Sequence, residues 1–261
     1  MSRLKRLLTQ IWPRVAILVL IVFVWWAAYE TRYWDRVLLP SPASVWEVLW
    51  SNLTGADGLL AVAYRSVFRL FAGLTLAVAI GTPIGLSMAG WKLMQRSVGS
   101  LMVGLQALPS IAWLPLASLW FGINEKAVLF VVVIGAVPAV AIATAASVRL
   151  VPPNLVRAGR TLGAHGWELY GKVVLPAAVP GYIAGLQLAW AIAWRALMAA
   201  ELIVTGARGL GHLIARAAVQ RDTPLVLATM VVIMLVGIGV DSLFSVVDRR
   251  VRRKRGLLVS G

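Results

Sequence analysis

Six long stretches of this chain consist almost entirely of apolar residues, and short segments between them hold most of the charges. The stretches cover about residues 15–29, 67–89, 98–121, 126–148, 179–203 and 224–247. A bilayer core about 30 Å thick needs roughly 20 apolar residues per helical span. The runs are continuous, whereas a transmembrane barrel requires alternating positions. The pattern therefore predicts an all-α, polytopic membrane protein with six transmembrane helices in a single transmembrane domain over residues 1–261.

The overall composition supports the same class. Of the 261 residues, 60% are hydrophobic and 13% are charged, and the mean hydropathy is +0.84, whereas a soluble domain usually carries about 25% charged residues. A net charge of +15 also raises nucleic-acid binding as a possibility, but the positive residues lie mainly at span ends, where a membrane protein places them. The chain has no cysteine, which excludes disulfides, thiolate zinc sites and cysteine nucleophiles.

Lysine and arginine are unevenly divided between the two sides that six spans define. With both termini in the cytoplasm, the cytoplasmic segments hold sixteen of them and the outer segments eight. The cytoplasmic set is Arg3, Lys5, Arg6, Arg14, Lys92, Arg96, Arg149, Arg157, Arg160, Lys172, Arg249, Arg250, Arg252, Arg253, Lys254 and Arg255, and the outer set is Arg32, Arg36, Arg65, Arg69, Lys126, Arg208, Arg216 and Arg221. Because cytoplasmic loops are enriched in these residues, we expect both termini in the cytoplasm.

The N-terminal part of the chain predicts two further features. The first apolar run follows a basic segment, as a secretory signal does, but Trp25, Trp26 and Tyr29 stand where small residues would mark a cleavage site. We therefore expect a retained first helix. The outer segment from Leu39 to Trp50, LPSPASVWEVLW, predicts a short amphipathic helix at the membrane surface.

The segment over residues 151–178 carries too many charges to remain in the bilayer. Its pattern predicts a short helix with a partly apolar face, a turn at Gly163, and a restart of the chain as the fifth span at Pro176 and Pro180. We expect a helix–turn–helix across the cytoplasmic face of the membrane. The candidate contact residues are Arg157, Ala158, Gly159, Leu162, Gly163, Ala164, His165 and Trp167.

This segment, RAGRTLGAHGWELYGKVVLPAAVP from Arg157 to Pro180, resembles the signature loop of the inner-membrane permeases of bacterial ABC importers. Ala158, Gly163, Leu175, Pro176 and Pro180 match that loop, while Arg157 replaces its glutamate and Gly159 replaces its second alanine. Two other stretches, LPSIAWLPLASLWFGI (Leu108 to Ile123) and AAELIVTGARGLGHLI (Ala199 to Ile214), resemble the nitrate, sulfonate and taurine branch of this family.

The resemblance implies a function and a set of partners. It implies a permease subunit for a small anion, such as an aliphatic sulfonate, taurine, nitrate or bicarbonate, in the bacterial cytoplasmic (inner) membrane. An uncharged vitamin-precursor-like solute remains an alternative. The implied partners are a second copy of the chain, two ATPase subunits that receive the signature loop as a coupling helix, and an extracytoplasmic binding protein. ATP and magnesium are then bound by the ATPase, and this chain carries no cofactor and catalyses no reaction.

Other classes of function are weaker explanations of the same residues. An ion-coupled secondary transporter predicts inverted repeats, and no convincing internal repeat is seen. Gly166, Gly171 and Lys172 match most of a phosphate-loop pattern, but Val173 replaces the required Ser or Thr. An intramembrane enzyme needs a convergent catalytic set, and His165 with Glu168 supplies only half of a metal site. We expect neither a catalytic site nor a metal site.

Polar residues within the predicted spans are candidates for the translocation path, because charges at membrane depth are costly. Arg195 lies eight residues, or about 12 Å of helix, from the outer end of the fifth span. It either lines the path or forms a structural pair with an acidic residue such as Glu201. Glu201 itself lies near a span end, where it can reach the interface. Pro109 and Pro115, with Ser110 between them, each predict a bend in the third span, compatible with a gate-lining helix and with structural bending alone.

Small residues recur at every fourth position on two spans. They are Gly135, Ala139, Ala143 and Ser147 on the fourth span and Gly181, Gly185, Ala189 and Ala193 on the fifth, with Gly81 and Gly85 similarly spaced on the second. Such ridges allow close approach of another helix. The spacing is compatible with packing within one chain and with a seam between two copies.

Overall fold

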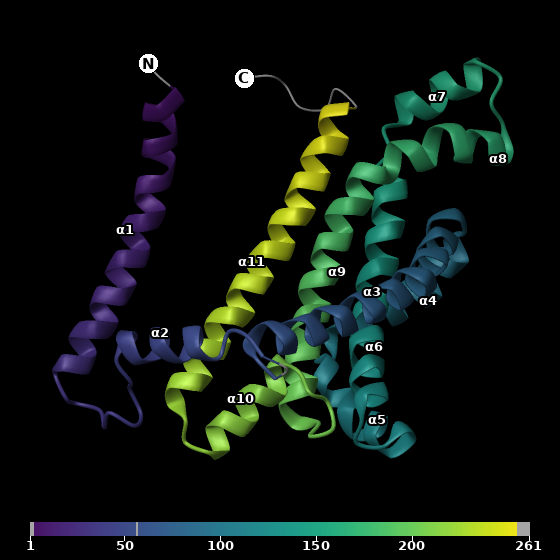
Figure 1. Ribbon diagram of the computed structural model, residues 1–261. Coiled ribbons are helices and arrows are strands. Elements are labelled where there is room, and N and C mark those ends of the chain that lie inside the picture. The colour runs from purple at the N-terminus through teal and green to yellow at the C-terminus, as the bar shows by residue number, and fades with distance from the viewer. Residues whose placement is uncertain (1–2, 56, 255–261) are drawn as a thin grey trace. The chain divides into compact units, whose positions relative to one another are not determined.

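The computed structural model describes residues 3–55 and 57–254, and every regular element in that part of the chain is helical. The elements are α1 (Arg3–Glu30), α2 (Pro42–Ser51), α3 (Leu59–Gly90), α4 (Lys92–Ala107), η1 (Ser110–Trp113), α5 (Leu114–Phe121), α6 (Glu125–Arg149), α7 (Pro153–Thr161), α8 (Gly166–Leu169), η2 (Tyr170–Val174), α9 (Leu175–Ile203), α10 (Leu210–Val219) and α11 (Thr223–Lys254) (Figure 1). The predicted all-α class is confirmed. Arg255, assigned to the basic tail, lies outside the described residues.

The contacts divide the chain into two compact units, one with residues 1–61 and 213–232 and one with residues 62–212 and 233–261. In the first unit, the indole of Trp25 donates a hydrogen bond to the Pro40 carbonyl (3.1 Å). The expected amphipathic helix is present as α2, whose start is capped by the Ser41 hydroxyl accepting from the Ser44 N–H. Its Trp46 and Trp50 rings stack 6.3 Å apart and are exposed, as suits an interfacial position.

Four helical stretches of the described chain are long and apolar enough to cross a membrane: Leu59–Gly90, Glu125–Arg149, Gly166–Ile203 and Thr223–Arg253. A fifth is available if the pair Lys92–Ala107 and Ser110–Phe121 forms one broken span. The predicted first span corresponds to the shorter apolar helix Val15–Glu30. These helices fall on the six predicted apolar runs, and the number of membrane crossings stays a prediction.

The third predicted span differs from its expected form. The sequence predicts one helix over 98–121 that bends at Pro109 and Pro115, but α4 ends at Ala107 and the chain turns by 95° before Ser110–Phe121. Leu108 and Pro109 are extended at this break. Pro115 causes no bend, because it lies in the first turn of α5, where a missing N–H removes no intrahelical hydrogen bond.

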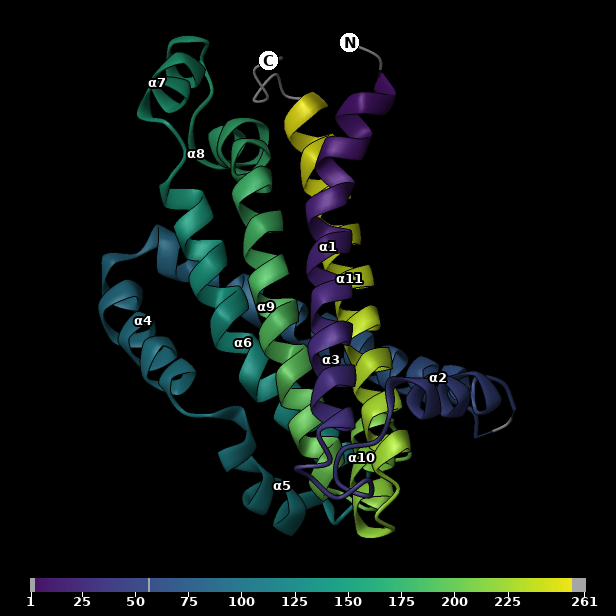
Figure 2. The ribbon, with the colours of Figure 1, turned by 90° about the vertical axis from the view of Figure 1, so that its left-hand side faces the viewer.

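The second unit is built around α6, most of whose residues are buried. The helix lies beside α9 in both views (Figures 1 and 2). A Cβ added to Gly181 would lie 3.0 Å from the Ser147 Cβ, and one added to Gly185 would overlap Ala143. On another side of α6, a Cβ on Gly81 would lie 2.9 Å from the Val137 carbonyl oxygen. The small-residue ridges are therefore occupied by helix packing within one chain.

Candidate functional site

The predicted helix–turn–helix is present between α6 and α9, at one end of that helix pair (Figure 1). Helix α7 ends at Thr161, and Gly163 follows with φ of +90°. Its N–H donates to the Arg160 carbonyl (3.0 Å), and the Ala164 N–H donates to the Gly159 carbonyl (3.0 Å). This is the usual glycine termination of a helix, in which a side chain with a Cβ is strained. The sequence thus correctly predicts the turn at Gly163.

The segment presents large apolar side chains to its surroundings. Leu162 is 87% exposed and Trp167 is 91% exposed. Among the other candidate contact residues, Arg157, Ala158, Gly163 and His165 are exposed and Ala164 is half-buried, whereas Gly159 is buried. A Cβ on Gly159 would lie 2.9 Å from Leu169 Cδ1 and from Val173 Cγ2. Gly159 therefore allows α7 to pack on the following helix and is not on the exposed surface.

The polar residues of this segment bond to one another and to nearby backbone. Lys172 donates to Glu168 across one helical turn (2.6 Å). This hydrogen bond, together with the attraction of the opposite charges, lowers the pKa of Glu168 and raises that of Lys172. The His165 ring bonds the Gly163 carbonyl through Nδ1 (2.7 Å). Over residues 3–55 and 57–254, no three metal-ligating side chains gather, and Gly166 to Lys172 lies in helix rather than in a loop after a strand.

Arg195 lies on α9 with its side chain exposed, and its Nε donates to the Ala191 carbonyl of its own helix (3.0 Å). Among the described residues no carboxylate bonds to it.

Asp241 of α11, also exposed, accepts from the amide of Gln187 (2.6 Å). Pro109 is exposed at the break before η1, and Ser110 packs toward Gly135 of α6.

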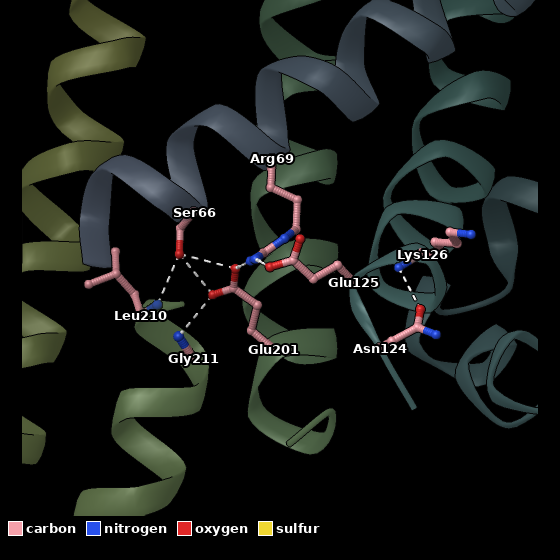
Figure 3. A network of polar contacts seen from close by, with 8 residues as sticks. All are labelled: Ser66, Arg69, Asn124, Glu125, Lys126, Glu201, Leu210 and Gly211. Atoms are coloured by element: carbon pink, nitrogen blue, oxygen red, sulfur yellow. Dashed lines mark hydrogen bonds and ion pairs between the residues drawn. The ribbon is translucent and has the colours of Figure 1, made fainter. Parts of the chain in front are cut away.

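Glu201 lies near the end of α9, as the sequence places it, but its side chain is turned inward. It is 0% exposed and lies in a polar network between four helices (Figure 3). Its carboxylate pairs with the guanidinium of Arg69 from α3. It also accepts from the Ser66 hydroxyl (2.9 Å) and from the Gly211 N–H at the start of α10 (3.1 Å). A structural pair between Arg195 and Glu201 is thereby excluded in this conformation.

Further polar contacts and a tightly packed loop surround the Arg69–Glu201 ion pair. Ser66 accepts from the Leu210 N–H (2.9 Å), and Arg69 also pairs with Glu125, the first residue of α6 (2.6 Å). A Cβ on Gly209 would overlap the Glu201 carboxylate, and one on Gly211 would lie 2.6 Å from the Met198 carbonyl oxygen. Glycine is therefore required for the loop between α9 and α10 to cover the carboxylate. Burying a charge without a partner is costly because the charge loses its hydration. Here the ion pair and the hydrogen bonds replace the lost water around the carboxylate.

The sequence pattern places Arg69 in an outer segment and does not predict this network. Two signals in the sequence point toward it. Ser66 and Arg69 are three positions apart and so share one face of a helix, and the stretch from Gly206 to Gly211 holds three glycines, which indicates close approach of backbone to another group. Neither signal identifies Glu201 as the partner, because 132 positions separate it from Arg69.

Comparison with known proteins places most of the chain among transport components. Residues 81–253 match a family described as the binding-protein-dependent transport system inner membrane component. The chain is 34% identical over 210 residues to an ABC transporter permease protein of Methanocaldococcus jannaschii, with 79% of each chain covered. It is 28% identical over 246 residues to the taurine transport system permease protein of Escherichia coli (92% of this chain and 89% of the relative). Identity to a bicarbonate transport permease of Synechococcus elongatus is 30% over 196 residues (75% and 70%).

Solved structures with the same fold are also transporters. An inward-facing structure of the MetNI methionine ABC transporter aligns with a TM-score of 0.63 and 19% identity, covering 81% of this chain and 99% of the other. An amino acid ABC transporter with histidines aligns with a TM-score of 0.60, also at 19% identity, covering 75% and 93%. At this identity the likeness concerns the fold alone.

The family match and the relatives confirm the transport function expected from the signature loop, and they confirm that this chain is a transport subunit rather than an enzyme. Their family implies an ATPase and a substrate-binding protein as partners, and a multi-pass position in the membrane. The chain belongs to the binding-protein-dependent transport system inner membrane components, and it is the transmembrane permease subunit of an ABC importer.

Proposed function

We propose that two copies of this chain form the import path for a small anion, such as an aliphatic sulfonate, taurine, nitrate or bicarbonate. The observation that carries the proposal is the guanidinium of Arg195, which is exposed on α9 and, within the described part of the chain, bonds only to its own helix. The named relatives for taurine, bicarbonate and aliphatic sulfonates support the same class of solute.

The position of Arg195 argues against contact with lipid. It lies eight residues before the end of α9, about 12 Å along the helix axis. A charged side chain near the centre of a span costs about 2.5–3.5 kcal/mol on insertion scales, and arginine does not lose its proton in proteins. This face of α9 therefore meets water or another protein chain. A solute anion 4 Å away gains about 4 kcal/mol at an effective dielectric constant of 20.

A second copy of the chain completes the path in this proposal. Within one chain α6 is enclosed by α3 and α9 through the small-residue contacts, so these ridges are not available to a partner. The exposed face of α9 that carries Arg195 remains available to a second copy. Two such faces around a common axis enclose a path that contains one arginine from each copy. The basic tail places both termini of each copy in the cytoplasm.

The exposed segment of α7 and α8 couples this path to ATP hydrolysis. Leu162 and Trp167 present apolar surface at the end of a short, tightly turned projection, which suits insertion into a groove of another protein. We place that groove on a cytoplasmic ATPase, two copies of which bind ATP and magnesium. This chain itself then needs no cofactor.

The test is uptake by the reconstituted complex with Arg195→Gln. The complex of permease, ATPase and binding protein is placed in proteoliposomes, and anion uptake and ATP hydrolysis are measured together. We expect assembly and ATP hydrolysis to persist while uptake falls by at least about tenfold. The attraction of about 4 kcal/mol between the guanidinium and a solute anion exceeds the roughly 1.36 kcal/mol that a factor of ten requires. Arg208→Gln, at an exposed position of the loop after α9, is the control and keeps normal uptake. Unchanged uptake by a well-expressed Arg195→Gln complex would refute the role in the path, and loss of complex yield alone would indicate a structural role.

A further inference from the structure

The helix that joins the exposed segment to the path contains one irregular turn. From Gly166 to Ile203 the chain is continuously helical, but residues Tyr170–Val174 form a π-helical turn, η2. There the Leu175 N–H donates to the Tyr170 carbonyl, five residues earlier. Such turns are rare, and they occur mainly as single insertions at functional positions of α-helices.

Proline explains why the wide turn lies at this place. Pro176 is in the first turn of α9. In a regular α-helix its ring would press against the carbonyl of Lys172, four residues earlier, and that carbonyl would receive no hydrogen bond. One extra residue in the preceding turn relieves this conflict. The sequence Leu175–Pro176 thus separates two helical pieces that would otherwise form a single rigid rod.

The two sides of this turn pack on different parts of the chain. On the side of the exposed segment, Leu169 and Val173 lie against Gly159 of α7. On the other side, Val174 and Ala178 pack with Val148 at the end of α6 and with Val151 just beyond it. The change of packing partner falls between two successive residues, Val173 and Val174, inside the irregular turn.

The opposite end of α9 is held firmly. Glu201 binds α3 through Arg69 and Ser66, and it binds the start of α10 through the Gly211 N–H. This network has its charges paired, and its core is inaccessible to water. Helix α9 is therefore fixed at the Glu201 end and along α6, and it joins the α7–α8 segment only through a turn with weakened helical geometry.

We propose that η2 is the joint at which movement of the α7–α8 segment bends or rotates the start of α9, while the Arg69–Glu201 network keeps the far end of α9 in place. The inference rests on the proposed docking of α7–α8 to an ATPase. The extra residue of a π-turn can move one position along the helix. The residue that it passes then rotates by about 100° around the helix axis and moves by about 1.5 Å along that axis. A small displacement at the ATPase is thus converted into a discrete change of helix register.

Two pairs of spin labels test the joint in the full complex, and the cysteine-free chain allows them to be placed freely. One pair, Asn154→Cys with Leu188→Cys, spans η2, and the other, Phe68→Cys with Ile203→Cys, spans the network. All four positions are exposed. Between the nucleotide-free state and a state trapped with ATP, we expect the first distance to change by more than about 1.5 Å, the rise of one residue, and the second to stay constant. A constant first distance, or an equal change in both, overturns the proposal.

A substitution gives a functional readout of the same joint. Pro176→Ala restores the N–H and removes the ring, so the regular α-helix becomes favoured. We expect the complex to assemble and to hydrolyse ATP, while the number of solute molecules imported per ATP falls several-fold. Pro180→Ala makes the same chemical change one turn further into α9 and keeps the normal ratio. A normal number of solute molecules imported per ATP in Pro176→Ala refutes the joint alone. Failure of the unaltered chain to capture an ATPase refutes both the docking role and the joint.

Discussion

Replacing Glu201 by glutamine leaves the Arg69 guanidinium buried with only one of its two carboxylate partners. The side chain of Arg69 is 8% exposed and that of Glu201 is 0% exposed, whereas Glu125 is 65% exposed. Removing one partner of a buried pair costs about 3–5 kcal/mol. Because Glu125 remains and the glutamine oxygen still accepts from Ser66 and Gly211, we expect a loss near 3 kcal/mol, the lower end of this range.

Related variants separate the charge from the hydrogen bonds. Glu201→Ala also leaves the Ser66 hydroxyl and the Gly211 N–H without their acceptor, and each such bond contributes about 1 kcal/mol. Its expected loss is therefore about 5 kcal/mol. The double variant Glu201→Gln/Arg69→Met removes both charges of the pair, and we expect it to recover most of the loss because no unpaired buried charge remains.

The assay is the free energy of unfolding of the purified permease in mixed micelles, measured by titration with a denaturing detergent. The control is Glu125→Gln, which removes the exposed partner and costs less than about 1 kcal/mol. If Glu201→Gln lies within about 0.5 kcal/mol of the unaltered chain, the scale of an ordinary surface substitution, the ion pair does not stabilise the fold. If the double variant is less stable than Glu201→Gln, the cost does not arise from an unpaired buried charge.

Three further outcomes are expected. Gly163→Val forces a β-branched residue to φ near +90°, so transport should be abolished while membrane insertion survives; normal transport-coupled hydrolysis would contradict the coupling role. Cysteine at position 52 should react with an impermeant thiol reagent in intact cells, and cysteine at position 258, outside the described residues, should not; the reverse labelling would invert the topology. Gly185→Leu should destabilise the chain by about 1–3 kcal/mol through overpacking against Ala143, with Gly104→Leu, where a Cβ meets open space, as the neutral control in the same unfolding titration.

The sequence by itself determined the class of protein, the position of its main helices and the helix–turn–helix that joins the fourth and fifth apolar runs. A spanning helix must satisfy its backbone hydrogen bonds within its own residues, so a local run of apolar residues is sufficient to predict it. The turn at Gly163 is equally local, because the need for positive φ depends on one residue. Local chemistry thus accounts for what was predicted correctly, including the signature from Arg157 to Pro180.

Only the tertiary structure decided which polar groups meet. The sequence offered Arg195 as a partner of Glu201, but the partner is Arg69, which folding brings next to Glu201 from another helix. It also left open whether the small-residue ridges face the same chain or a second copy, and the packing of Gly185 on Ala143 settles this for one chain. The third apolar run predicts a bent helix, and only the structure shows that the helix is interrupted at Leu108 and Pro109 and that α5 then packs on α6. Helix periodicity places residues on a face, whereas the partner of that face is chosen by packing between segments distant in the chain.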